Sequence, residues 1–255
     1  MDTPPFLGPL GVQLAKSAAA HAAKVLLIRR PGRVEPRRHK VWFVVDTLTG
    51  LSTSGTWDSE ADLLALARHL GDVNGPMAGE APDLVLVCTH GTRDACCAIR
   101  GRPVAGLLSR QRPDEVWECS HLGGHRFAAT LLLLPDGACY GVLDQAHAAR
   151  VVAGHREGRP SPNQLRGLTR LSPPEQVAHV WAMRHHPEAA GGILVGGAVA
   201  IDESHARVVF ELPGGETEWV DVERVDLEPA ALSCGKGPQA RAEYRVIEGT
   251  EREDP

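Results

Sequence analysis

The chain has 255 residues, of which 43% are hydrophobic and 23% charged, and its formal net charge at pH 7 is −5. This length corresponds to one large domain or two small ones, at about 150 residues per domain. The negative charge and an aromatic content of 4% argue against a nucleic-acid partner, because nucleic-acid-binding domains carry basic faces and base-stacking aromatic side chains.

The sequence also lacks the pattern of a membrane or exported protein. The longest apolar stretch, Gly192 to Ile201, has about half of the roughly 20 residues that a membrane-spanning helix needs. The N-terminus carries Asp2 and two prolines where a signal peptide has a basic start and an apolar core. We therefore expect a cytoplasmic protein with no membrane partner.

Short apolar runs predict the strands of the first 155 residues, and 3.6-residue spacing predicts the helices. Strands are expected over residues 24–29 and 41–46, paired with each other, and over 84–87, 116–119, 127–134 and 139–143. Helices are expected over residues 58–70, 103–110 and 144–153, the second with Pro103 in its first turn. This alternation predicts an α/β fold with a thioredoxin-like domain over residues 1–157.

A smaller α+β extension is expected after a Gly- and Pro-rich linker at residues 158–162. Ser172 to Glu175 has the pattern of a capping box and predicts a helix that runs to His186. Strands are expected over residues 193–201, 207–212 and 218–222, with a hairpin turn at Gly214 and Gly215. Residues 163–255 are thus interpreted as a second domain of one helix and a small sheet.

Two motifs carry the chemistry. The first, Cys88-Thr-His-Gly-Thr-Arg-Asp-Ala-Cys-Cys97, begins where a predicted buried strand ends, which is where α/β folds place their sites. The second, Cys119-Ser-His-Leu-Gly-Gly-His-Arg-Phe127, holds His121 and His125 on either side of two glycines. The glycines allow a tight turn that brings both imidazoles to one point. Two thiolates and two imidazoles make a four-coordinate set.

That set has two common occupants. Zinc binds Cys₂His₂ tetrahedrally, and a [2Fe–2S] cluster can take two cysteines on one iron and two histidines on the other. The eight residues between Cys88 and Cys97 exceed the usual C-x₂₋₄-C spacing of structural zinc sites, which favours the larger cluster. Spacing alone leaves zinc, or no metal, open.

The two motifs resemble those of the sucrase/ferredoxin-like family, whose members are also called thioredoxin-like ferredoxins. The resemblance covers residues 83–145 most clearly and implies a thioredoxin-like fold with a [2Fe–2S] cluster. By position in the motifs, Cys88 and Cys97 would bind one iron, and His121 and His125 the other. Many relatives have a basic residue before the second cysteine and a glycine after it, where this chain has Cys96 and Ala98. Cys96 therefore remains an alternative ligand.

The neighbouring residues have supporting interpretations. Cys119, two residues before His121, is a further alternative ligand, although a buried strand residue is the simpler interpretation. Metal-bound histidines and thiolates need hydrogen bonds that orient them, and His90, Arg93 and Asp94 are the candidates. Two cysteines lie outside the motifs. Cys139 is expected in the hydrophobic core, and Cys234 is expected to be an isolated thiol.

The resulting hypothesis is an electron carrier rather than a stand-alone enzyme, working with an unidentified redox partner protein. Neutral imidazole ligands raise the potential of the cluster above that of an all-cysteine ferredoxin, and an exposed imidazole N–H would couple electron to proton transfer. A zinc-stabilised interaction module is the main alternative. A thiol oxidoreductase using Cys96 and Cys97 is weaker, because the chain has no Cys-x-x-Cys motif.

Overall fold

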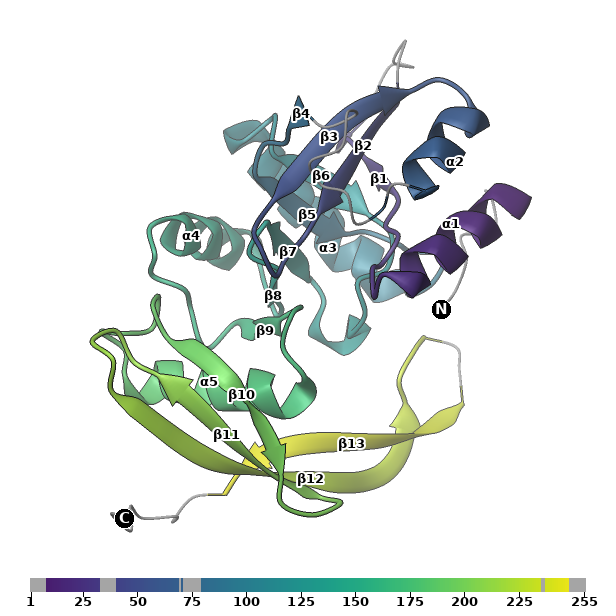
Figure 1. Ribbon diagram of the computed structural model, residues 1–255. Helices are drawn as coiled ribbons and strands as arrows, with labels where there is room; N and C mark the ends of the chain where they lie inside the picture. Colours follow the sequence, from purple (N-terminus) through teal and green to yellow (C-terminus); the bar gives the residue numbers. More distant parts are fainter. Residues whose placement is uncertain (1–7, 33–39, 69, 71–78, 235–236, 248–255) are drawn as a thin grey trace.

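The computed structural model describes residues 8–32, 40–68, 70, 79–234 and 237–247. Its centre is a six-stranded mixed sheet (Figure 1). In spatial order the strands are β1 (Ile28–Arg29), β6 (Val116–Cys119), β5 (Leu84–Cys88), β7 (Leu131–Leu134), β8 (Ala138–Tyr140) and β9 (Leu165–Leu168). Only β5 and β6 are parallel, and the other neighbours run antiparallel. The predicted α/β class is confirmed.

Strand β5 lies inside the sheet and is buried on both faces, which explains its unbroken apolar sequence. Because side chains alternate along a strand, Val85 and Val87 pack into one core cluster with helices α3 (Ala95–Gln111) and α4 (Gln145–Arg156). Leu84 and Leu86 pack into a second cluster on the opposite face. The end of β5, where Cys88 lies, is therefore enclosed from both sides.

The second face is covered by a three-stranded sheet of β2 (Lys40–Val45), β3 (Ser52–Trp57) and β4 (Gly79–Glu80). The predicted pairing of residues 24–29 with 41–46 is wrong. β2 pairs with β3, and β1 pairs with β6. A local turn explains the difference: the carboxylate of Asp46 accepts a hydrogen bond from the N–H of Leu48, and this closes a hairpin that joins β2 to its neighbour in sequence.

Two further helices lie beside this sheet (Figure 1). Helix α2 (Glu60–Arg68) confirms the helix predicted over residues 58–70, and α1 (Gly8–Ala20) has no counterpart in the prediction. The two helices contact each other, and the hydroxyl of Ser17 donates to the carbonyl of Ala67. No helix in the described part of the chain has the length and apolar character to cross a membrane.

The helix predicted over residues 103–110 is wrong at its start. Helix α3 begins at Ala95 and contains Pro103 in its interior. Pro103 lies on the exposed side of the helix and lacks the N–H of an ordinary helix residue. As a result, Cys96 and Cys97 occupy the first turn of a helix rather than a loop.

The strand predicted over residues 127–134 is shorter than expected. β7 begins at Leu131, and a 3₁₀ helix, η2 (His125–Phe127), precedes it. Backbone hydrogen bonds from Phe127 to Gly124 and from Ala128 to His125 form this turn. The hairpin of β7 and β8 and the following helix α4 confirm the prediction.

The C-terminal part packs a four-stranded antiparallel sheet on helix α5 (Pro173–His185). Its strands are β10 (Leu194–Ala200), β11 (His205–Glu211), β12 (Thr217–Ala231) and β13 (Pro238–Val246). Strands β10 to β12 and the hairpin turn confirm the prediction, and the backbone N–H of Ser172 donates to the carboxylate of Glu175 as the capping box requires. Strand β12 continues well beyond the predicted residues 218–222, and β13, with which it pairs, was not predicted (Figure 1).

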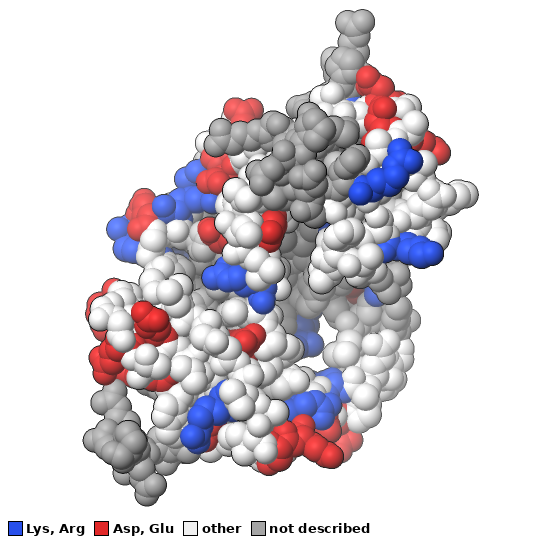
Figure 2. Space-filling view, in the orientation of Figure 1, with Lys and Arg blue, Asp and Glu red and all other residues white. Residues whose placement is uncertain are grey.

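The six-stranded sheet and the four-stranded sheet share one core. Side chains of α5 and of β11 join the cluster that is formed by β5, α3 and α4. Strand β9, which the sequence did not predict, precedes α5 and pairs with β8 of the first sheet. On the face seen in Figure 2, Lys and Arg side chains are interspersed with Asp and Glu.

Candidate metal centre

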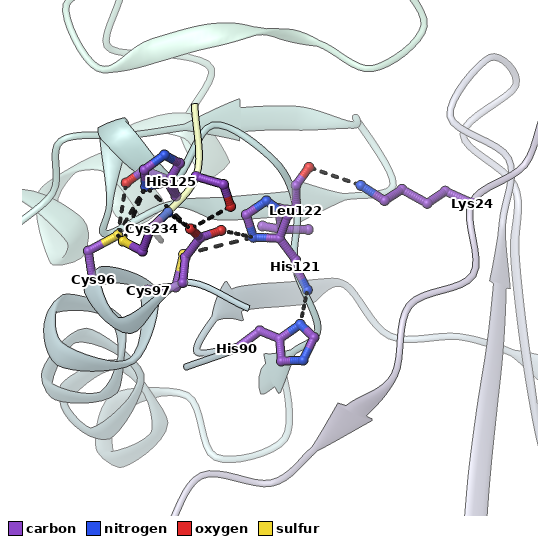
Figure 3. A network of polar contacts seen from close by, with 10 residues as sticks. Lys24, His90, Cys96, Cys97, His121, Leu122, His125 and Cys234 are labelled. Carbon is purple, nitrogen blue, oxygen red and sulfur yellow. Dashed lines mark hydrogen bonds and ion pairs between the residues drawn. The ribbon is translucent and has the colours of Figure 1, made fainter. Parts of the chain in front are cut away.

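Thiols and imidazoles from both motifs meet at the carboxyl end of β5. Figure 3 shows Cys96 and Cys97 on α3 facing His121 and His125, with Cys234 reaching the same place from the far end of the chain. The donor atoms form two groups, and within each group all of them lie within 4.8 Å of one another.

The inner group consists of Cys88, Cys97 and His121. Both cysteines are fully buried, and Sγ of Cys97 lies 3.9 Å from Nδ1 of His121. Hydrogen bonds from the Cys97 thiol, from His121 and from the backbone N–H groups of His90 and Leu122 lower the pKa of the Cys88 thiol, although burial opposes this shift. The same contact with Cys88 raises the pKa of Cys97. The hydrogen-bonded contact between these two thiols therefore favours a thiolate within the inner group, and the thiolate is the form that binds a cation.

The outer group consists of Cys96, His125 and Cys234. Sγ of Cys96 lies 3.3 Å from Nδ1 of His125 and 3.9 Å from Sγ of Cys234. The third side, from Sγ of Cys234 to Nδ1 of His125, is also 3.9 Å. Burial, reinforced by the neighbouring Cys234, raises the pKa of the Cys96 thiol. Cys234 is exposed, so this group lies nearer the surface than the inner one.

Asp94 joins the two groups. It is 1% exposed, and its two carboxylate oxygens lie 3.7 Å from Nδ1 of His121 and 3.7 Å from Nδ1 of His125. The oxygen facing His125 accepts hydrogen bonds from the Ser233 hydroxyl, at 2.8 Å, and from the Cys234 N–H, at 2.6 Å. Burial favours the neutral acid, but these hydrogen bonds and the two imidazoles lower the pKa of Asp94 overall. The carboxylate is thus held ionised between the two imidazoles.

The turn between the two histidines confirms the role expected of its glycines. Gly123 and Gly124 have φ angles of +107° and +60°, a backbone region that favours glycine. Gly124 leads directly into η2, which begins at His125. The backbone N–H of His121 donates to Nδ1 of His90, at 3.3 Å, so the His90 side chain contacts the start of this turn.

A close helix contact sets the distance between the two inner cysteines. Gly101, one turn after Cys97 in α3, packs against the carbonyl of Cys88, and a Cβ at Gly101 would lie 2.1 Å from that oxygen. Only glycine lets the helix approach the end of β5 so closely. No motif or spacing singled out this glycine in advance.

Other predicted residues lie around the centre. Cys119 is buried on β6 beside Cys88 and belongs to neither group, and Cys139 packs against the second core cluster as expected. Arg93 lies in the turn before α3, next to Asp94. Arg126 places its guanidinium over the ring of Phe127, 4.5 Å from the ring centre. Cys234, expected as an isolated thiol, is instead part of the outer group.

The residues present fit a soft metal centre. Thiols and imidazoles are the donors that zinc sites and iron–sulfur clusters take, and four thiols and two imidazoles converge here. The Asp94 oxygen that faces His121 is buried and has no hydrogen-bond partner among the described residues. A cationic centre between the imidazoles would satisfy this oxygen electrostatically.

The fold and the two groups define an α/β protein whose cysteines and histidines are compatible with metal binding. Comparison with protein families matches residues 15–167 to the Sucrase/ferredoxin-like family. The match spans more than half of the chain and contains both motifs, so the protein belongs to this family. A search of the curated proteins found no match.

Proposed function

We propose that the protein is an electron carrier that holds a [2Fe–2S] cluster through Cys88, Cys97, His121 and His125. The main support is the meeting of thiols and imidazoles from two separate motifs around one buried carboxylate, Asp94. When bound, such a cluster accepts and returns one electron, at a potential above the roughly −400 mV of an all-cysteine cluster.

The chain's own residues prepare this site. Hydrogen bonds stabilise the Cys88 thiolate, and the complete burial of Cys88 and Cys97 keeps water away from the inner sulfurs. The imidazoles of His121 and His125 turn their Nδ1 atoms toward the other donors, so each carries its proton on Nε2 when Nδ1 binds a metal. The outer group lies near the surface, where a redox partner protein can approach.

The test is a visible absorption spectrum of anaerobically purified protein, before and after dithionite, with iron and zinc counted on the same sample. We expect a red-brown protein with about two irons per chain that bleaches on reduction. A colourless protein without iron would refute the electron-carrier proposal.

A zinc-stabilised interaction module is the second candidate. Its support is that each group combines two cysteines with one histidine, a donor set typical of zinc. Zinc without iron in the same measurement would favour this candidate, and the protein would then be redox-silent.

A further inference from the structure

We propose that Cys96 and Cys234 form a reversible disulfide beside the metal centre, with a small disulfide such as oxidised glutathione as the oxidant. The four ligands of the proposed cluster are other residues, so the centre stays complete whether this pair is reduced or oxidised. The inference goes beyond the proposed function and takes from it only the assignment of the ligands. Cys234 lies outside the residues matched to the family, and neither motif contains it.

The two thiols are free and already lie close together. Their Sγ atoms are 3.9 Å apart, although 138 positions separate the two residues in sequence. Each sulfur must move by about 1 Å to reach bonding distance, and rotation about the Cα–Cβ bond moves a sulfur without moving the backbone. The Cys96 thiol also lies 3.3 Å from Nδ1 of His125. A bound iron occupies the lone pair of this nitrogen, so the loaded centre leaves the thiol to Cys234.

The backbone of each cysteine is held in place. One oxygen of Asp94 accepts hydrogen bonds from the Ser233 hydroxyl, at 2.8 Å, and from the Cys234 N–H, at 2.6 Å. Ser233 and Asp94 are both buried, at 8% and 1% exposure, so this anchor lies in the interior. Cys96 belongs to the first turn of α3 and faces Cys234 (Figure 3). Because both backbones are fixed, each thiol meets the other at a high effective concentration.

The exposure of the two thiols sets the order of the reaction. Cys234 is exposed and Cys96 is half-buried, so the Cys234 thiolate attacks oxidised glutathione first and releases one glutathione thiolate. The Cys96 thiol then attacks this mixed disulfide and releases the second glutathione. Two electrons and two protons leave the cysteine pair, and the oxidant becomes two molecules of reduced glutathione. The reverse exchange with reduced glutathione restores both thiols.

The other cysteines of the chain are placed differently. Cys119 is buried on β6, and Cys139 packs against the second core cluster. Neither belongs to a group of donors among the described residues. The sulfurs of Cys88 and Cys97 are engaged as ligands in the proposed cluster. The disulfide therefore has one expected location, where it fastens the end of β12 to the first turn of α3.

The experiment equilibrates the anaerobic protein, as purified, with mixtures of reduced and oxidised glutathione. Alkylation then traps the remaining thiols, and mass spectrometry of tryptic peptides locates the link. Trypsin places Cys96 and Cys97 in the peptide 94–100 and Cys234 in the peptide 225–236. We expect these peptides to be joined, with fragmentation assigning the bond to Cys96. The link should disappear in excess reduced glutathione, and the iron content should not change on oxidation.

Four variants separate a built pair from a chance contact. Cys96→Ser and Cys234→Ser should each lose the link and keep the iron, because neither residue is a ligand of the proposed cluster. Cys139→Ser is the matched control and should form the link as the wild type does. Ser233→Ala keeps both thiols but removes a hydrogen bond to a charged group, so the equilibrium constant for disulfide formation should fall about tenfold.

Peptides that stay separate after oxidation would overturn the inference. Loss of iron in Cys96→Ser or on oxidation would also overturn it, because the pair would then share the ligand set. A wild-type equilibrium constant in Ser233→Ala would show a chance contact instead of a built pair. The two proposals fail separately. If the link forms in a protein that carries no iron, only the electron-carrier function fails, and if the iron is present without the link, only the disulfide fails.

Discussion

The approach of α3 to the end of β5 makes Gly101 a sensitive position. A Cβ at Gly101 would lie 2.1 Å from the carbonyl oxygen of Cys88, whereas real Cβ contacts stay above 3.0 Å. In Gly101→Ala the helix must therefore move by about 1 Å, an overpacking change that typically costs 1–3 kcal/mol. We expect the upper end of this range, because the obstacle is a backbone atom.

Gly106 in the same helix provides the matched control. A Cβ there would meet nothing nearer than the Arg110 guanidinium at 3.9 Å, so Gly106→Ala should gain about 1 kcal/mol of helix propensity without strain. Both variants receive this gain, and they should therefore differ by about 3 kcal/mol. For a chain of this size that difference corresponds to roughly 6–12 °C in Tm.

The same movement affects the metal centre. Cys97 lies one turn before Gly101, so a displaced helix carries its thiol away from Cys88. Metal–ligand distances tolerate only about ±0.2 Å, and we therefore expect Gly101→Ala to lose most of its metal while Gly106→Ala retains it. Differential scanning calorimetry and metal analysis measure both effects. If the two alanine variants were equally stable and equally loaded with metal, the close contact would not matter as described.

Three further expectations concern other parts of the molecule. Burial, helped by the positive charge of Arg170, lowers the pKa of His179 to about 4, so protonation of His179 favours the unfolded state. The free energy of unfolding should therefore fall by about 3 kcal/mol as the pH drops from 6.5 to 4. Urea denaturation should show this dependence on pH in the wild type but not in His179→Gln. Cys97→Ser should lose most of its iron while Cys119→Ser keeps it, since only Cys97 belongs to a donor group; iron analysis of both decides, and equal loss would contradict the assignment. Phe210 is fully buried on β11 beside Trp181, so Phe210→Ala should lower the free energy of unfolding by about 3–5 kcal/mol, and a loss below 1 kcal/mol in a denaturant titration would refute this packing.

Local patterns predicted most of the central elements. The unbroken apolar run of β5 follows from its burial on both faces, and the capping box of α5 follows from the side-chain chemistry of Ser172 and Glu175. Pairing was harder to predict. The sequence of a strand does not show which strand it pairs with. β2 pairs with β3 rather than with β1 because a turn at Asp46 closes the β2–β3 hairpin. The start of α3 was predicted wrongly because Pro103 was placed in the first turn. An exposed proline is tolerated inside a helix that the core holds in place.

The candidate centre was partly predictable for a similar reason. The two motifs carry their own spacing and glycines, and these indicated that His121 and His125 would lie near Cys88. Cys234 lies outside both motifs and was expected as an isolated thiol. It lies among small and polar residues typical of a turn, and its contact with Asp94 spans 140 positions in sequence. Only the path of the long β12–β13 hairpin brings it to the centre.

This path has a consequence for the order in which the centre assembles. In the inner group the contact between Cys97 and His121 closes a loop of 24 residues, whereas that between Cys96 and Cys234 in the outer group closes one of 138. For a flexible chain the longer closure costs about 1.5 kcal/mol more in entropy. We therefore expect the inner thiols and His121 to come together before the outer group, which needs the last strands to have formed. On this reasoning a chain that lacks the final hairpin would hold the inner donors without the Cys234 thiol.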